Sequence, residues 1–453
     1  MREIKLSAEK LISALLNLSE TQTVCFLDSC AVSHLDSHFL IAGANPVECL
    51  QITNKNPFET LKVFDEKIAN PDLAGIFTIS YDFGLKFENI ESRKKEFFSF
   101  PEPDVFLALF DCLIIHDYAL NKTFFTGNEK KFDSLEKIFF KSQDFFCRQD
   151  FQRSKITSNF SREQYLAAVK KVQKYIRRGD TYQTNLTQQF HALLPENLTP
   201  QQIFWHLRET HPAPFAAFIK REEDFVVSIS PERFFRVQSS KFKVQSPIIS
   251  TSPIKGTRPR GKTKEEDFRL KNELVKSEKD RAENVMIVDL LRNDLGRICK
   301  FGSVRVEKLC ALETHPTLFH LVSTIKGELR ERLNFSDILK AVFPCGSITG
   351  APKIRTMQII DELETVNRGL SMGAIGYSIP NSKFQIPNSE TLDFQLPTFD
   401  LNVAIRTMLI RENKAIFNVG GGIVIDSIPE DEYQETLLKA KALIKSINGD
   451  FIV

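Results

Sequence analysis

The chain has 453 residues, enough to bury a large core in one composite domain or in two to three domains of ordinary size. Its 42% hydrophobic and 26% charged residues are typical of globular proteins, and no stretch approaches the ~20 apolar residues of a membrane span. Sixty basic and 58 acidic side chains leave a formal charge of +2. This balance excludes a global positive field that would hold nucleic acid or an anionic membrane.

Two features of the sequence bear on the compartment. Residues 1–20 interrupt their apolar positions with charges every few residues, so we expect no signal peptide. The eight cysteines are scattered and form no CxxC pair, which favours reduced thiols in a cytoplasmic protein.

The first third of the chain, residues 1–155, contains short apolar runs that predict strands separated by turns and helices. The runs lie at 23–30 (TVCFLDSC), 73–83 (LAGIFTISYDF) and 104–120 (DVFLALFDCLIIHDYAL). No cluster of residues in this part points to a particular chemistry.

From Ser161 the pattern changes to clearly marked helices and strands. Ser161 is the expected N-cap of a helix that Gly179 ends. Further helices are expected at 265–299, 351–366 and 429–447, and strands at 181–194, 216–248, 304–315, 318–329, 371–379, 399–410 and 414–425. Residues 380–398 are polar and rich in turn formers, and we expect them to form an inserted loop that projects outward.

Two of the expected helices each carry a pair of carboxylates three residues apart. Asp280 and Glu283 form one pair, and Glu432 and Glu435 form the other. If the helices converge, these acids could hold Mg²⁺, which takes one or two protein carboxylates besides water and substrate oxygens. The alternative is helix stabilisation, because Glu435 and Lys439 have the spacing of a favourable ion pair.

Two glycine-containing segments could meet an anion. Gly420, Gly421 and Gly422 follow an apolar run, and without Cβ atoms their backbone amides can approach a ligand closely; a bulge or tight turn is the alternative. The segment 345–357, CGSITGAPKIRTM, lacks the spacing of a phosphate-binding P-loop. It instead predicts a hydroxyl-rich turn at a helix N-terminus, suited to a carboxylate.

Three basic side chains stand in unusual places. Lys255 lies between Pro253 and Gly256, residues that restrict or extend the backbone conformations available. Arg406 is expected inside an apolar strand, where it needs an internal acid or a ligand carboxylate. His320, also in an apolar strand, could equally be a satisfied core histidine. Together with the acids and glycines, these groups would suit a small dicarboxylate.

Residues 160–450 resemble the chorismate-utilising enzymes, a family that includes anthranilate, isochorismate, salicylate and aminodeoxychorismate synthases. The resemblance is carried by motifs in a fixed order: YIRRGDTYQTNLTQQF, SISPERFF, PIKGTRPRG, KDRAENVMIVDLLRNDLGR, HLVSTIKGEL, FPCGSITGAPKIRTMQIIDELE, GAIGY, IRT and GGGIVIDSIPEDEYQET. It implies an α+β fold in which antiparallel sheets form a two-lobed sandwich, with helices outside and the site in the cleft. Residues 156–453 would be the chorismate-binding region, and residues 1–155 a divergent part that adds strands and helices to the sandwich.

The resemblance also implies the ligand-binding groups. Glu283 and Glu435 would bind Mg²⁺, with Asp280 and Glu432 supporting them, and the cation would hold the ring carboxylate of chorismate. His320 would lie near the departing C4 hydroxyl. The groups that would hold the substrate carboxylates and its enolpyruvyl group are Thr349, Tyr377, Arg406, Lys439 and the backbone of Gly420, Gly421 and Gly422.

Within the family, the PIKGT motif marks the branch that aminates chorismate at C4. The resemblance makes Lys255 a nucleophile that attacks C2 as water leaves C4, after which ammonia enters at C4 and expels the lysine. Glu232 would be its acid or base, and the constrained turn would lower the pKa of Lys255. Gln183 stands where water-adding relatives have a lysine base, which favours ammonia as the nucleophile.

The expected reaction is chorismate plus ammonia to 4-amino-4-deoxychorismate, toward p-aminobenzoate and folate, with ammonia from a separate glutamine amidotransferase. Two alternatives remain: an anthranilate-forming component, or a catalytically silent relative that binds chorismate or an amino acid. Cys345 departs from the family's usual glycine and could alter its turn. Residues 24–30 are the expected remnant of an amino-acid pocket found in some relatives.

Overall fold

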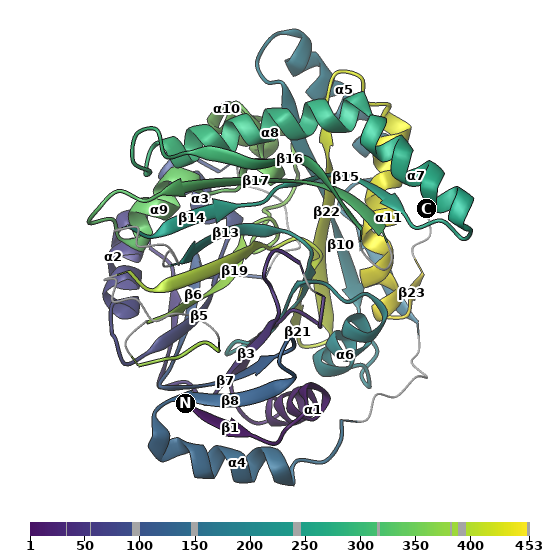
Figure 1. The fold of residues 1–453 in the computed structure, drawn as a ribbon. Helices are drawn as coiled ribbons and strands as arrows, with labels where there is room; N and C mark the ends of the chain where they lie inside the picture. Colours follow the sequence, from purple (N-terminus) through teal and green to yellow (C-terminus); the bar gives the residue numbers. More distant parts are fainter. Residues whose placement is uncertain are drawn as a thin grey trace.

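The computed structural model shows two large antiparallel sheets between layers of helices (Figure 1). It describes residues 1–32, 34–54, 56–92, 100–145, 153–238, 246–314, 318–380, 383–387 and 396–450. Runs of strands that pair antiparallel, with helices segregated to the outside, place the chain in the α+β class, as predicted.

The first sheet has 13 strands. In spatial order they are β1 (Arg2–Ile4), β8 (Lys122–Gly127), β7 (Cys112–Asp117), β3 (Phe39–Ala44), β2 (Val24–Asp28), β11 (Phe215–Lys220), β12 (Phe225–Ser230), β21 (Thr407–Arg411), β22 (Lys414–Ile423), β10 (Gln183–Leu193), β9 (Ser154–Ser158) and β23 (Gly449–Asp450), with β18 (Gly350–Ala351) paired to β10. Only the β9–β23 pair at one edge is parallel.

The second sheet has ten strands. In spatial order they are β15 (Ile254–Pro259), β17 (Leu318–Glu328), β14 (Ile248–Thr251), β13 (Arg233–Gln238), β20 (Thr398–Val403), β19 (Ala374–Ile379), β5 (Ala74–Ile79), β6 (Val105–Phe110) and β4 (Glu48–Ile52), with β16 (Arg305–Thr314) paired to β17. The N-terminal part therefore contributes strands to both sheets.

The described helices are α1 (Ala8–Leu18), α2 (Pro57–Ile68), α3 (Tyr81–Phe87), α4 (Phe132–Lys141), α5 (Arg162–Arg177), α6 (Pro200–Thr210), α7 (Lys264–Lys276), α8 (Glu278–Gly296), α9 (Phe335–Val342), α10 (Lys353–Leu363) and α11 (Pro429–Ser446). The start of α5 confirms the predicted N-cap. Ser161 accepts a hydrogen bond from the Gln164 amide, and the Gln164 side chain accepts one from the Ser161 amide.

Three buried clusters define the layers. Ile76, Phe106, Ile219 and Leu409 come from both sheets and pack between them. The outer face of the first sheet packs against α1, α4, α6 and α11. The outer face of the second packs against α2, α3, α8, α9 and α10. Each sheet is thus apolar on both faces. Because both faces are buried, the sequences of many strands are nearly continuous apolar runs.

The chain crosses between the sheets at two adjacent points. Residues 231–232 join β12 to β13, and residues 404–406 join β20 to β21. Hydrogen bonds tie the crossings together, since Ser230 Oγ donates to Val403 O at 2.6 Å and the Val403 amide donates to Glu232 O at 3.0 Å. The predicted single strand at 399–410 is therefore wrong. It is two strands of different sheets, with Arg406 at the bend and a φ of 50°.

Part of the predicted inserted loop packs inward instead of projecting outward. Phe384 is 2% exposed and joins the cluster between the sheets. The Gln385 amide donates to Thr126 Oγ1 at 2.8 Å, and Lys383 pairs with Asp72 at 2.9 Å. Polar composition concealed this anchor, because one buried ring is enough to attach a loop. Residues 381–382 and 388–395 of the loop lie outside the described residues.

Two of the compartment features can be followed in the structure. In the described ranges, no helix is both long enough and apolar enough to cross a bilayer. Seven cysteines are free thiols, and Cys147 lies outside the described residues.

Substituting Phe384 tests this anchor. We expect Phe384→Ala to lower the free energy of unfolding by about 3 kcal/mol, because the ring leaves a cavity between the sheets. Lys383→Ala, the matched control, removes only a surface ion pair and should cost less than about 1 kcal/mol. Urea denaturation measures both changes; equal small losses would show that the loop does not contribute to the core.

Candidate active site

Lys255 lies where the edge strand β15 leaves regular pairing with β17. The register shifts between Ile254 and Thr257, and Gly256 has a φ of 83°. A Cβ on Gly256 would lie 3.0 Å from the Asp280 Cβ atom of α8. Glycine therefore serves both the backbone conformation and the close approach of the helix. The bulge directs Lys255 toward α8, where its Nζ lies 2.6 Å from Glu283 Oε1.

Glu283 joins three other elements. The same Oε1 also accepts a hydrogen bond from Gln183 Nε2 of β10 at 2.7 Å. Strand β22 passes beside this contact, and a Cβ on Gly422 would lie 2.0 Å from Gln183 Nε2 and 2.8 Å from Glu283 Oε1. Only glycine leaves room for the Gln183–Glu283 contact.

The glycine run is part of a strand and not a turn, which corrects one of the predicted alternatives. Gly420 and Gly422 pair with Thr187 and Asn185 of β10. Strand β22 pairs with β21 only over 414–417, so along 418–423 its other edge has no strand partner in the described part of the chain. Contact of these backbone groups with a ligand stays a prediction.

Helix α11 brings the second pair of acids to the neighbouring position of β22, Gly421. Lys439 Nζ lies 2.7 Å from Glu435 Oε1 and donates to Gly420 O at 2.9 Å. A Cβ on Gly421 would lie 3.3 Å from Glu432 Oε2 and 3.8 Å from Glu435 Oε1. Glu432 is buried and accepts a hydrogen bond from Ser427 Oγ at 2.6 Å.

The structure contains the predicted ion pair between Glu435 and Lys439. It also brings Glu435 close enough to Glu283 for their charges to interact. Burial raises the pKa of Glu435 and Lys439 lowers it, with a net lowering, while the charge of Glu283 opposes that lowering. Burial and then Glu435 raise the pKa of Glu432, partly offset by the Ser427 hydrogen bond. Three carboxylates of two helices thus lie near adjacent glycines of one strand.

These acids do not form a preassembled metal cage. Among the described residues, no group of three or more His, Cys, Asp or Glu side chains is arranged to hold a metal. Asp280 instead pairs with Arg258 at 3.3 Å. The donor set nevertheless fits Mg²⁺, which needs only one or two protein carboxylates. Both hydrogen bonds to Glu283 reach Oε1, leaving Oε2 for a cation.

The pKa of Lys255 is raised, contrary to the expected lowering. Burial lowers it, but the charge of Glu283, the hydrogen bond to that carboxylate, and the charges of Glu232 and Glu435 raise it more. The turn supplies the orientation that was predicted, whereas the neighbouring acids decide the protonation state.

Glu232 occupies the first crossing between the sheets. Its side chain is buried, and Oε1 has no hydrogen-bond partner within the described ranges of the chain. Burial raises the pKa of Glu232, and Ser347 and then Lys255 partly oppose the shift. This is the environment of a carboxyl group that can carry a proton near Lys255.

The turn after α9 supplies one wall of the site. Lys255 Nζ donates to Ser347 O at 3.4 Å, and Thr349 Oγ1 donates to Cys345 O at 3.0 Å. Thr349 is fully buried, with its hydroxyl held by the turn itself. Cys345 has a φ of −57°, so its departure from glycine requires no unusual backbone conformation. Its Sγ lies 3.3 Å from Ser347 Oγ.

His320 and Arg406 lie on neighbouring elements. His320 is on β17 and its Nδ1 lies 2.9 Å from Thr257 Oγ1, two residues from Lys255. Arg406 is at the second crossing, where burial lowers the pKa of its guanidinium. The part of the chain that the structure describes provides no hydrogen bond or ion pair to that side chain, and no contact links it to Glu283.

A family model described as chorismate binding enzyme matches residues 22–445. The chain belongs to this family. It is 39% identical over 374 residues to aminodeoxychorismate synthase component 1 of Escherichia coli K12, covering 82% of this chain and 76% of the relative. It is 37% identical over 398 residues to anthranilate synthase component 1 of Aquifex aeolicus, covering 83% and 74%.

The same relationship appears in three dimensions. The crystal structure of anthranilate synthase component I from Streptococcus pneumoniae TIGR4 superposes with a TM-score of 0.75 at 28% identity, covering 91% of this chain and 93% of that one. The predicted fold, a two-sheet α+β sandwich similar to anthranilate synthase component I, is confirmed.

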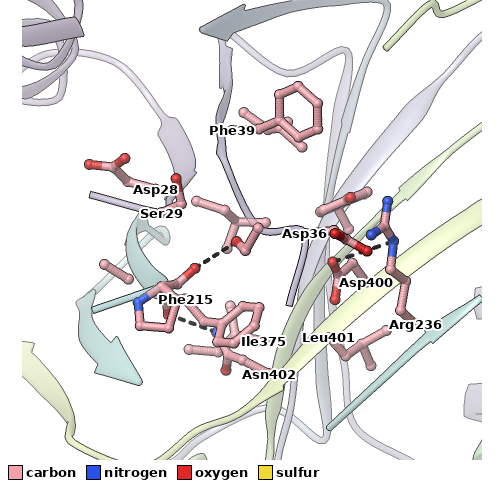
Figure 2. A pocket seen from close by; sticks show the side chains of 16 residues that line it. Asp28, Ser29, Asp36, Phe39, Phe215, Arg236, Ile375, Asp400, Leu401 and Asn402 are labelled. Atoms are coloured by element: carbon pink, nitrogen blue, oxygen red, sulfur yellow. Dashed lines mark hydrogen bonds and ion pairs between the residues drawn. The ribbon is translucent and has the colours of Figure 1, made fainter. Parts of the chain in front are cut away.

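Tyr377, a predicted site residue of this chorismate binding enzyme, lines a cavity between the sheets. Figure 2 shows this cavity, with Asp28, Ser29, Arg236 and Asp400 among the residues around it. The cavity has a volume of about 40 Å³. Leu27, Asp28 and Ser29 line it, so residues 24–30, the expected remnant of an amino-acid pocket, border a cavity between the sheets.

Sequence reasoning missed three residues that support the site. Ser347 offers its carbonyl to Lys255. Glu364 accepts hydrogen bonds from the Thr187 amide of β10 at 2.8 Å and from Arg368. The available signal was the i, i+4 spacing of Glu364 and Arg368 after an apolar helix, but such pairs are usually on the surface.

The Gly422 position gives a sharp test of the geometry. We expect Gly422→Ala to reduce chorismate turnover by about 10²-fold, because the added methyl group separates Gln183 from Glu283. Gly296→Ala is the matched control, since a Cβ there meets nothing within 4 Å. Steady-state kinetics on both variants would contradict the arrangement if Gly422→Ala kept the wild-type rate.

Proposed function

We propose that this chain is the chorismate-converting component of an aminodeoxychorismate synthase. It would convert chorismate and ammonia into 4-amino-4-deoxychorismate, toward p-aminobenzoate and folate. The observation that carries the proposal is Lys255, held by a bulge and a glycine at the centre of the carboxylate cluster. Relatives from Escherichia coli and Bacillus subtilis named aminodeoxychorismate synthase component 1, at 39% and 36% identity, support it.

Chorismate carries two carboxylates, and the site offers positive and hydrogen-bonding groups to receive them. Arg406 is partly buried and has no ion-pair partner among the described residues, so a substrate carboxylate would supply that partner. Lys439, the unpaired edge of β22 and the Thr349 turn supply further contacts. Gln183 keeps the Glu283 carboxylate in place and provides no base for water.

We assign Mg²⁺ to Glu283 and Glu435, with Asp280 and Glu432 as supporting acids. When bound, the cation would balance the charge of the ring carboxylate and of the developing transition state. Glu432 is buried beside Glu435, and Asp280 is paired with Arg258. Neither acid needs to move in order to support the two carboxylates that would bind the cation.

Lys255 then acts as the nucleophile. Glu232 takes a proton from its ammonium group, and the free amine forms a bond to C2 while both ring double bonds shift, to C1=C6 and C4=C5, and the C4–O bond breaks. The hydroxyl leaves as water with the proton from Glu232, near His320. Ammonia next bonds to C4, the C2–N bond breaks, and Lys255 recovers a proton from the new ammonium group. The net change replaces the C4 hydroxyl with an amine and releases water.

Ammonia would come from a separate glutamine amidotransferase in the cytoplasm. The word component in the names of the relatives supports a second chain, and the free thiols suit a reducing compartment. Glutamine-dependent turnover should therefore appear only when such a glutaminase is added.

Anthranilate synthase component 1 is the second candidate function. It is favoured by the 37% identity to the Aquifex aeolicus protein and by the structural likeness to the Streptococcus pneumoniae enzyme. Lys255 and the identity of the product separate the two.

A product assay decides between them. Purified protein with chorismate, Mg²⁺ and ammonium should yield aminodeoxychorismate, identified by chromatography and mass. Lys255→Ala should lower turnover by roughly 10³-fold or more, because the covalent route is lost. Lys262→Ala, an exposed lysine of the following loop, should leave turnover unchanged. Anthranilate as the product would refute the proposed branch.

The metal assignment makes a separate prediction. Chelation should abolish turnover and added Mg²⁺ should restore it, and Glu435→Gln should raise the Mg²⁺ concentration for half-maximal rate about tenfold or more. Glu430→Gln, on the same helix but paired with Arg162, is the matched control. If both variants show the same Mg²⁺ titration, Glu435 does not bind the cation.

A further inference from the structure

Arg368 lies between α10 and β19, is 3% exposed, and makes four hydrogen bonds. Two reach Glu364, at 2.6 Å to Oε1 and 2.9 Å to Oε2. The others reach main-chain oxygens, Asn185 O at 2.7 Å and Ile348 O at 2.9 Å. The guanidinium also lies 4.5 Å from the ring of Tyr81, which closes its remaining face.

Both main-chain partners belong to segments that carry site groups. Ile348 follows Ser347, whose carbonyl accepts from Lys255. Asn185 is two residues beyond Gln183 and pairs with Gly422. The Asn185 amide also donates to Thr349 O at 2.7 Å, so the turn and β10 meet at this point.

Only a guanidinium can make this set of contacts. Its planar fork presents five N–H donors in fixed directions, and here four contacts in different directions are satisfied at once. A lysine has three donors on a single nitrogen, so it cannot reproduce four contacts that start from three separate guanidinium nitrogens. Loss of Arg368 would leave Glu364 with only its hydrogen bonds from Thr187, and would remove this donor from the buried carbonyls of Asn185 and Ile348, between the two walls that enclose Lys255.

We propose that Arg368 is a positioning residue of the reaction, fixing the 346–349 turn relative to β10 so that Lys255 meets the substrate in one orientation. The assignment rests on the proposed function, because it takes Lys255 as the nucleophile. Arg368 touches neither Lys255 nor Glu283 in this arrangement, and it acts through Ser347 and Gln183.

The test compares Arg368→Lys with Arg208→Lys under chorismate, Mg²⁺ and ammonium. Arg208 is a matched control, since it is a largely buried arginine bound to Asp28 at 2.8 Å and to Tyr118 at 3.1 Å, remote from the site. We expect both variants to lose thermal stability, but only Arg368→Lys to lose kcat, by about 10- to 100-fold. Equal kcat values for the two variants would overturn the proposal.

Chemical rescue provides a second readout that a purely structural role would not produce. Arg368→Ala leaves a cavity of guanidinium shape, and millimolar guanidinium should restore part of its kcat, whereas it should not restore Lys255→Ala. If Arg368→Ala does not fold, the kcat of Arg368→Lys relative to Arg208→Lys decides the test. Folded Arg368→Ala with wild-type kcat would also overturn the proposal.

Failure of the proposed function gives a different result. If the wild type forms another product, the branch is wrong, and the variants are compared on that product. If it forms none, calorimetry measures chorismate affinity instead: weaker binding by Arg368→Lys but not Arg208→Lys supports positioning, and unchanged binding by both overturns it.

Discussion

One carboxylate oxygen, Glu283 Oε1, holds the site together, because Lys255 and Gln183 both donate to it. Those two contacts fix β15, β10 and α8 relative to one another. They also require that β22 pass without a side chain at Gly422, where a Cβ would lie within 2.8 Å of the same oxygen. The glycine at position 422, the bulge of β15 and the buried side-chain amide of Gln183 therefore all follow from the hydrogen bonds to Glu283.

The second constraint is that the chain must change sheets beside this carboxylate. Glu232 and Arg406 stand at the two crossings, and the crossings are bonded to each other through Val403. At a crossing the backbone leaves both hydrogen-bonding ladders, which allows an uncommon φ at Arg406. Glu232 and Arg406, which has no ion-pair partner among the residues that the structure describes, therefore lie where the sandwich is least regular.

Local sequence signals predicted much of the fold. The capped start of α5, the apolar strands of the second half and the four acids on two helices all follow from nearest-neighbour chemistry. The predictions that failed concern contacts between residues far apart in the sequence. The bend at Arg406 depends on which sheet each strand joins, and the strand character of Gly420 depends on pairing with Thr187, more than two hundred residues earlier.

Within the site, residue identities were easier to predict than environments. Residue type and spacing placed Lys255 and Glu283 in one cluster, but the pKa of Lys255 is set by acids that come from α8, α11 and a crossing. The environment of Tyr377 was also not predicted from the sequence. Its strand was predicted, but the side of the sheet it lines was not, and it faces the small cavity between the sheets.

The charges of the cluster explain how a dicarboxylate could enter it. Glu283, Glu435 and Glu432 are each paired with a lysine, namely Lys255, Lys439 and Lys279. In the proposed complex, the two carboxylates of chorismate and a divalent cation would together add no net charge, so the charge balance of the site would be preserved. A cation at the other oxygen of Glu283 would weaken the electrostatic interaction with Lys255 that keeps the amine protonated. Binding of the substrate pair and activation of the nucleophile would then be the same event, because both depend on the one carboxylate that joins the four elements.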